Sequence, residues 1–152
     1  MDETQFKQVL RANVASVPYA EGLNNHMGSA LTEQALPMKW TMDVANELNL
    51  FFVDSRTSAA SIAWQQAIDQ AVPALTRDVF LDNDTDIEAL EMQFQRAITI
   101  ANEHGFAVLI GHPYPATAAF LSKSLSRLDE AGIKLVSASA LIWQLQPHLN
   151  AL

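Results

Sequence analysis

The sequence predicts an α/β fold in which parallel strands alternate with helices. Short unbroken apolar runs, of which 50–53 and 106–110 are two, are typical of parallel strands that are buried on both faces. Polar side chains follow each run directly, and stretches with apolar residues at helical spacing lie between the runs. This alternation fits either an open parallel sheet or part of a barrel.

The spacing of apolar residues sets the expected elements. The second helix is expected to turn Trp40, Val44 and Leu48 inward, the third to turn Ala71 inward, and the fourth to start its apolar stripe at Ile87. The predicted helices cover residues 4–14, about 36–48, 58–70, 84–104, 117–130 and 141–145. The predicted strands cover residues 17–20, 50–53, 79–81, 106–110 and 133–136.

Composition limits the classes of protein and partner. A chain of 152 residues that is 49% hydrophobic and 17% charged fits one compact domain over 1–152. A net charge of −8 argues against nucleic acid or an anionic membrane surface as the main partner. The absence of cysteine excludes a thiol nucleophile and leaves any metal to His, Asp or Glu. We expect no signal peptide and no membrane span in this sequence.

The stretch Gly22–Ser29 places one imidazole among small and amide side chains. His26 is flanked by Asn24, Asn25 and Ser29, whose polar groups are suited to fixing the tautomer of the ring. An imidazole that is held in this way suits metal ligation or proton transfer. The alternative is a polar turn in which the histidine only caps backbone groups.

Polar residues gather after the predicted strands. In parallel α/β folds the ligand lies at the carboxyl ends of the strands, so we expect these residues to converge on one rim. They are Asp54, Ser55, Arg56, Asp82, Asn83, His112, Tyr114, Ser137 and Ser139.

The four histidines differ in context. His112 directly follows a predicted strand and precedes a proline, which favours a role in a site. His26 and His112 would supply two nitrogen ligands to a divalent metal, with a carboxylate completing the set. His104 lies in the last turn of a helix before Gly105, where a cation suits the helix dipole, so we interpret it as structural. His148 lies in the tail, and we assign it no role.

The charged residues after the strands have two interpretations. Asp54 and Arg56 pair with each other or with Asp78 in a structural network, or they position a substrate. The sequence lacks a Gly-x-Ser-x-Gly nucleophile elbow, a Gly-x-Gly-x-x-Gly fingerprint and a phosphate loop. Serine hydrolase and nucleotide-binding functions are therefore disfavoured.

Four segments in this order resemble the divergent polysaccharide deacetylase family, and the resemblance runs from about Val17 to Ser139. The segments are Asn24–Ser29, Phe51–Thr57, Arg77–Asn83 and Gly111–Pro115. That family is similar to carbohydrate esterases with a distorted (β/α) barrel, in which a metal-bound water attacks an acetamide carbonyl. The resemblance implies an incomplete barrel of this type, a carbohydrate substrate, a divalent metal taken to be zinc, and a periplasmic or extracytoplasmic location.

The resemblance also implies roles for individual residues. His26 corresponds to a metal-ligand histidine, and His112 to a late histidine that acts as general acid or as a ligand. The implied catalytic residues are His112, Asp54 and Asp82. The implied substrate-binding residues are Asn25, Arg56, Arg77, Asp78 and Tyr114.

Two departures from the family pattern affect these expectations. Ala30 stands where ordinary members of the superfamily place a second metal histidine, four residues after His26. The family also begins with an apolar strand that ends in an Asp-Asp pair, and this sequence has no such segment. We therefore expect a domain without the family's N-terminal strands, and an exposed sheet edge through which the chain self-associates.

Three hypotheses follow for function. The first is a metal-dependent hydrolase of N-acetyl groups on carbohydrate, with turnover by this shortened chain left open. The second is a non-catalytic carbohydrate-binding or scaffold domain with the same fold, which the missing Asp-Asp pair favours. The third is an unrelated metal-binding α/β protein with the same rim.

Overall fold

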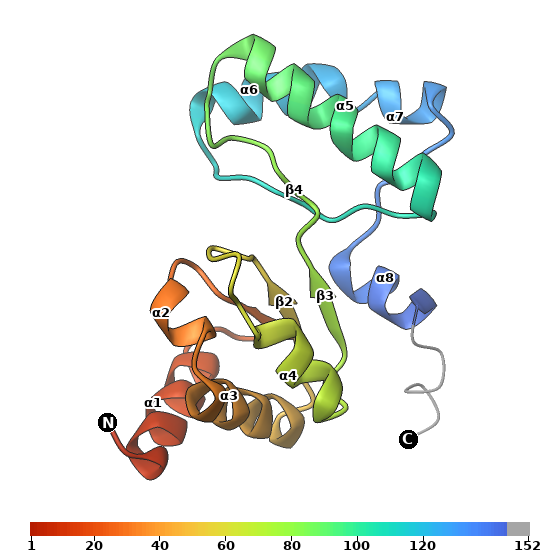
Figure 1. Ribbon diagram of the computed structural model, residues 1–152. Helices are drawn as coiled ribbons and strands as arrows, with labels where there is room; N and C mark the ends of the chain where they lie inside the picture. The colour runs from red at the N-terminus through yellow and green to blue at the C-terminus, as the bar shows by residue number, and fades with distance from the viewer. Residues whose placement is uncertain (146–152) are drawn as a thin grey trace. The chain divides into compact units, whose positions relative to one another are not determined.

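The computed structural model describes residues 1–145 and confirms the predicted α/β class, with parallel strands alternating with helices (Figure 1). The described residues form two compact units. The first unit comprises residues 1–76 and 137–145, and the second comprises 77–136. Each unit has its own small parallel sheet, and the described strands do not form a closed barrel. Pro147 and His148 lie outside the described residues.

The first unit is built on a three-stranded parallel sheet in the order β1-β2-β3. Leu23 of β1 is paired with Phe52 of β2, and Val53 of β2 with Leu75 of β3. The strands are β1 (Gly22–Asn24), β2 (Phe51–Asp54) and β3 (Ala74–Thr76). The helices are α1 (Glu3–Ala15), α2 (Ser29–Thr32), α3 (Ala35–Glu47), α4 (Ala63–Asp69) and α8 (Ala138–Leu145).

The apolar core of this unit lies between the sheet and helices α3 and α4. Small residues at Ala63 and Ala67, both fully buried, let α4 pack closely, as their helical spacing predicted. Removing such apolar surface from water is the main favourable contribution to folding. The core residues are Met38, Met42, Ala45, Leu50, Phe52, Ala63, Ala67, Val72 and Ala74.

Several predictions for the first unit are wrong in detail. The first strand is β1, within the His26 stretch, and not residues 17–20, because only β1 has a partner strand. Helix α4 begins at Ala63 rather than at 58. Leu48 is 37% exposed at the C-cap of α3, and Ala71 is exposed in a left-handed turn with φ of 55°. Trp40 is only half-buried, while Val44 is fully buried as predicted.

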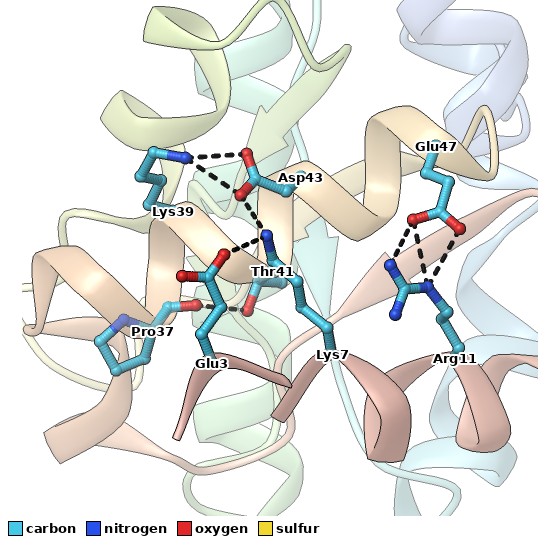
Figure 2. A network of polar contacts seen from close by, with 8 residues as sticks. All are labelled: Glu3, Lys7, Arg11, Pro37, Lys39, Thr41, Asp43 and Glu47. Carbon is cyan, nitrogen blue, oxygen red and sulfur yellow. Dashed lines mark hydrogen bonds and ion pairs between the residues drawn. The ribbon is translucent and has the colours of Figure 1, made fainter. Parts of the chain in front are cut away.

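Helix α1 is attached to α3 by ion pairs as well as apolar contacts, and none of its residues is fully buried (Figure 2). Lys7 Nζ lies 2.7 Å from Asp43 Oδ2, and Arg11 Nη2 lies 2.6 Å from Glu47 Oε2. A tilted contact between the rings of Phe6 and Trp40, at 5.7 Å between centroids, adds an apolar component. The amphipathic prediction for 4–14 is therefore confirmed, because Phe6, Leu10 and Val14 are partly buried and Val14 packs against the core. Lys7 and Arg11 lie on the same partly buried face.

The second unit has a two-stranded parallel sheet, in which Val79 of β4 is paired with Leu109 of β5. The elements are β4 (Val79–Phe80), α5 (Ile87–His104), β5 (Leu109–Ile110), α6 (Pro115–Ser124) and α7 (Arg127–Glu130). Helix α5 ends where predicted, because Gly105 adopts the left-handed conformation with φ of 85°. The buried core comprises Leu81, Leu90, Phe94, Phe120 and Leu128.

The second unit also departs from several predictions. The strand expected over 106–110 is reduced to β5, and 133–136 is not a strand, with Leu135 69% exposed. The helix expected over 117–130 is divided into α6 and α7, and it begins at Pro115 because proline fits the first helical position. Ile87 is 66% exposed and does not join the apolar stripe.

A two-point ion pair joins α5 to α7. Arg127 Nη1 and Nη2 donate to the two carboxylate oxygens of Glu91 over 2.7 and 2.6 Å. These hydrogen bonds, together with one from Gln95, lower the pKa of Glu91 to about 2. Because the pKa of Glu91 is lowered in the fold, its ion pair stabilises the folded chain at pH values above the ordinary carboxylate pKa. This stabilisation is lost as the pH falls toward 2.

Replacing Glu91 with Gln should therefore remove part of the dependence of the unfolding free energy on pH in acid. We expect Glu91→Gln to be less stable than wild type at pH 7, and the difference to shrink between pH 4.5 and 2. Urea unfolding across this range would measure it, with Glu103→Gln as a control for an exposed carboxylate on the same helix. A difference that stays constant with pH would contradict the assignment.

Candidate active site

A carboxylate and an imidazole meet at the carboxyl ends of the two strands of the second unit. Phe80 and Ile110 are paired in the sheet, and Asp82 and His112 each follow two residues later, so the register brings the two side chains together. Asp82 Oδ1 lies 3.0 Å from His112 Nδ1. The prediction that these two residues share the end of the sheet is therefore supported by their geometry.

Asp82 is held by three hydrogen-bond contacts in a fully buried position. Besides the ring contact at Oδ1, Oδ2 accepts from the backbone N–H of His112 over 2.6 Å and from Thr117 Oγ1 over 2.9 Å. Burial alone raises the pKa of Asp82, but the contacts from His112 and Thr117 together outweigh it and hold the pKa below its ordinary value. The carboxylate is therefore charged at neutral pH.

An ionised Asp82 decides what the imidazole of His112 can do. A carboxylate only accepts hydrogen bonds, so its contact with Nδ1 favours the proton on that nitrogen. The proton that the ring exchanges with a reacting group is then carried by Nε2. A buried carboxylate behind an imidazole also stabilises the ring when it becomes charged. This arrangement suits general acid or base chemistry.

Aromatic rings surround the imidazole. The ring of Tyr114 is stacked on His112, with centroids 4.9 Å apart and planes 27° from parallel, and Phe80 meets it edge-on at 5.4 Å. Arg77 Cζ lies 5.1 Å from the centroid of Phe80. Tyr114 is 45% exposed, so the stack borders solvent. Of the predicted substrate-binding residues, Tyr114 thus lies against the predicted acid, and Arg77 lies against Phe80, which contacts the same imidazole.

Asp78, another predicted substrate-binding residue, is engaged by the backbone. Its Oδ2 accepts from the N–H of Val108 over 2.7 Å, and its own N–H donates to the carbonyl of Val108 over 2.9 Å. This two-way contact fastens the start of β4 to the segment before β5. Its geometry favours a structural role in pairing the strands.

The His26 stretch of the first unit is built by the two asparagines that precede the histidine. Asn25 Oδ1 accepts from the N–H of Ser55 over 2.8 Å, and Asn24 Nδ2 donates to the Ser55 hydroxyl and, over 3.3 Å, to the carbonyl of Val53. The chain then turns through left-handed Met27, with φ of 59°. The two amides thus fasten this stretch to the end of β2, and His26 is exposed beside them.

Asp54 organises the loop after β2. Only 1% exposed, it accepts from the N–H of Arg56 over 2.8 Å, from Ser61 Oγ over 2.9 Å and from the N–H of Trp64 over 3.3 Å. The last donor is in the first turn of α4, where a carboxylate also suits the helix dipole. These contacts give Asp54 a role in holding the loop and the start of the helix.

The predicted rim residues fall into two groups. One surrounds Asp82 and His112 in the second unit, and the other joins Asn25 to the loop after β2 in the first. Ser137 and Ser139 lie at the start of α8, where Ser137 Oγ accepts from the N–H of Ala140. The convergence of all these residues on one rim stays a prediction.

Thr117 is the residue of this site that the sequence did not reveal. It was expected only as the start of a helix, yet it is 1% exposed and donates to Asp82. A polar residue in the first turn of a helix that follows the Gly111–Pro115 segment was the available signal. Threonine is common at helix starts, so that signal is weak without the structure.

Comparison with known proteins decides the family. A family model described as "Divergent polysaccharide deacetylase" matches residues 1–142. The chain belongs to the divergent polysaccharide deacetylase family. The resemblance that the four sequence segments indicated is thereby confirmed.

This family member has relatives that are themselves uncharacterized. It is 37% identical over 142 residues to the uncharacterized protein YibQ of Escherichia coli (strain K12). The aligned region covers 93% of this chain and 44% of YibQ. It is 43% identical over 122 residues to an uncharacterized protein of Haemophilus influenzae. This aligned region covers 79% of this chain and 44% of that protein. The chain thus spans less than half the length of these curated relatives.

The fold of this family member is also found in a solved structure. The crystal structure of the uncharacterized protein ATU2773 from Agrobacterium tumefaciens C58 matches with a TM-score of 0.89 and 22% sequence identity. The match covers 93% of this chain and 57% of that one. At this identity the likeness supports the fold alone.

Replacing Asp82 should destabilise the fold in a pH-dependent way. Asp82→Asn removes a charged acceptor from three contacts, so we expect a loss of about 2 kcal/mol in unfolding free energy at pH 7. Because the pKa of Asp82 is lowered in the fold, its contribution is present above the ordinary aspartate pKa and is lost as the pH falls. The difference from wild type should therefore shrink in acid.

Urea unfolding at pH 7 and at progressively lower pH would measure this effect. Asp84→Asn, at an exposed position two residues further on, is the matched control and should stay close to wild type. Equal destabilisation by the two variants would contradict the role given to Asp82.

Proposed function

We propose that this chain acts in the hydrolysis of N-acetyl groups on a carbohydrate, with His112 as general acid and Asp82 as the residue that orients it. The observation that carries the proposal is the contact between the buried, ionised Asp82 and His112 Nδ1 in a member of the divergent polysaccharide deacetylase family. Hydrolysis of an acetamide requires a proton at the departing amine nitrogen. A protonated His112 supplies it from Nε2 while Asp82 stabilises the charge on the ring.

The surroundings of His112 support a sugar as the substrate. Tyr114 is stacked on the imidazole and partly exposed, so it offers an aromatic surface against which the apolar face of a sugar ring packs. Arg77, beside Phe80, adds donors that suit hydroxyl and acetyl oxygens. A periplasmic or extracytoplasmic location, which the family resemblance implies, belongs to the same proposal. So does self-association through an exposed sheet edge.

The donor groups of the described residues do not fit the metal that the resemblance implies. Among residues 1–145, no cluster of three or more His, Asp or Glu side chains is placed to hold an ion. Open catalytic metal sites usually use three protein ligands, so the described residues do not make up a fitting set. The mechanism above therefore uses only Asp82 and His112. Zinc, with His26 and His112 as its histidines, stays a prediction.

No helix in the described part of the chain is long and apolar enough to cross a membrane.

Acetate release from N-acetylglucosamine oligosaccharides tests the proposal. We expect His112→Ala to lower the rate by about 10² to 10⁴, the usual cost of losing a general acid. His104→Ala is the matched control, because His104 is an exposed histidine at the end of α5, and it should leave the rate unchanged. Equal rates for wild type and His112→Ala would contradict the assignment of the acid.

A second candidate function is carbohydrate binding without turnover, which the partly exposed stack of Tyr114 on His112 favours. It predicts that the wild type binds the same oligosaccharides without releasing acetate, and that Tyr114→Ala weakens binding about tenfold. Titration calorimetry separates this result from hydrolysis. A wild type that neither binds nor hydrolyses these sugars would exclude both functions.

Metal analysis of the purified chain tests the zinc prediction. If His26 is a ligand, the wild type should carry stoichiometric zinc that is lost in His26→Ala, while His104→Ala should retain it. Absence of stoichiometric metal from the wild type would end the metal-dependent hypothesis for this chain.

A further inference from the structure

Thr117 contributes a hydroxyl that the proposed reaction does not use. It is 1% exposed in the first turn of α6, and its Oγ1 donates to Asp82 Oδ2 over 2.9 Å. Because the side chain of Asp82 is fully buried, water cannot readily replace this donor. The hydroxyl is thus an integral hydrogen-bond donor to the buried carboxylate.

The two oxygens of Asp82 are used differently. Oδ2 receives both the Thr117 hydroxyl and the backbone N–H of His112, and Oδ1 faces His112 Nδ1. The two donors at Oδ2 come from different elements, one from the loop after β5 and one from α6. Together they fix the rotation of the carboxylate, and therefore the position of Oδ1.

Gly111 limits the carboxylate on another side. A Cβ atom at this position would lie 3.3 Å from Asp82 Oδ2 and 3.5 Å from its Cγ. The backbone thus passes close to Oδ2, and the absence of a side chain leaves just enough room for the carboxylate. The close approach of Gly111 and the two donors at Oδ2 therefore leave Asp82 little freedom to move away from Thr117.

We propose that Thr117 is a positioning residue for His112, which acts by anchoring Asp82 Oδ2 so that Oδ1 is held against Nδ1 and the ring stays in its Nδ1–H tautomer. The inference rests on the proposed function for its catalytic consequence, but the effect on the tautomer does not depend on turnover. Without a fixed partner at Nδ1, a neutral imidazole in water prefers the proton on Nε2. A charged ring that relaxes to that tautomer loses its proton from Nδ1, whereas the proposed acid must donate it from Nε2.

Substitutions at Thr117 separate the hydroxyl from the packing. Thr117→Val keeps the shape of the side chain and removes the donor, so only the N–H of His112 remains at Oδ2. Thr117→Ser keeps the donor and should restore the wild-type state. Thr41→Val is a matched control, because Thr41 is a buried threonine of the first unit whose hydroxyl donates to the carbonyl of Pro37 over 2.8 Å.

The ¹⁵N chemical shifts of the histidine rings report the tautomer directly. They would be recorded on the four chains at a pH at which the imidazoles are neutral, with the His112 signals assigned by their loss in His112→Gln. We expect wild type, Thr117→Ser and Thr41→Val to show Nδ1–H at His112, and Thr117→Val to show a mixture containing Nε2–H. Dispersed amide spectra would show that each variant is folded.

Two results would overturn the proposal. One is a wild-type tautomer in Thr117→Val, and the other is an equal change in Thr41→Val. If acetate release is measurable, Thr117→Val should lower kcat about tenfold with KM little changed, and Thr117→Ser should recover it. A tautomer that shifts as expected in a chain that releases no acetate would support the positioning role and count against the proposed function.

Discussion

The buried carboxylate of Asp82 is the interaction on which the second unit depends. It follows β4, accepts from the loop after β5 and accepts again from the first turn of α6, so one side chain joins three parts of the fold. A charge can remain in a buried position only when its oxygens are satisfied. The contacts that keep Asp82 ionised are therefore the same contacts that place His112 in its orientation, and stability and chemistry are coupled at this point.

The first unit has a related buried carboxylate, Asp54, at the end of β2. It accepts from the loop after its own strand and from the start of the next helix, whereas Asp82 accepts from the loop after the neighbouring strand β5. The difference lies in the donors, because Asp54 binds backbone N–H groups and a serine hydroxyl, whereas Asp82 also binds an imidazole. A buried carboxylate therefore holds a loop in the first unit and orients the proposed proton donor in the second.

Sequence patterns predicted the elements that bury a periodic apolar face, and failed where tertiary contacts decide. Helix α5 was predictable from its stripe and Gly105, and the end of β4 from the change to polar residues at Asp82. Residues 133–136 have the composition of a strand but have no paired strand among the described residues, and the pattern could not show this. The contact of Asp82 with His112 follows from strand register, which sequence spacing alone does not set.

The attachment of α1 has a consequence for how the first unit responds to its surroundings. Besides the apolar contacts of Phe6 and Val14, α1 meets α3 through Lys7, Arg11 and their acidic partners (Figure 2). Attraction between partly exposed charges is screened over about 8 Å at physiological ionic strength. Higher ionic strength therefore weakens the ionic part of this attachment and leaves the apolar contacts of Phe6 and Val14 to hold the helix.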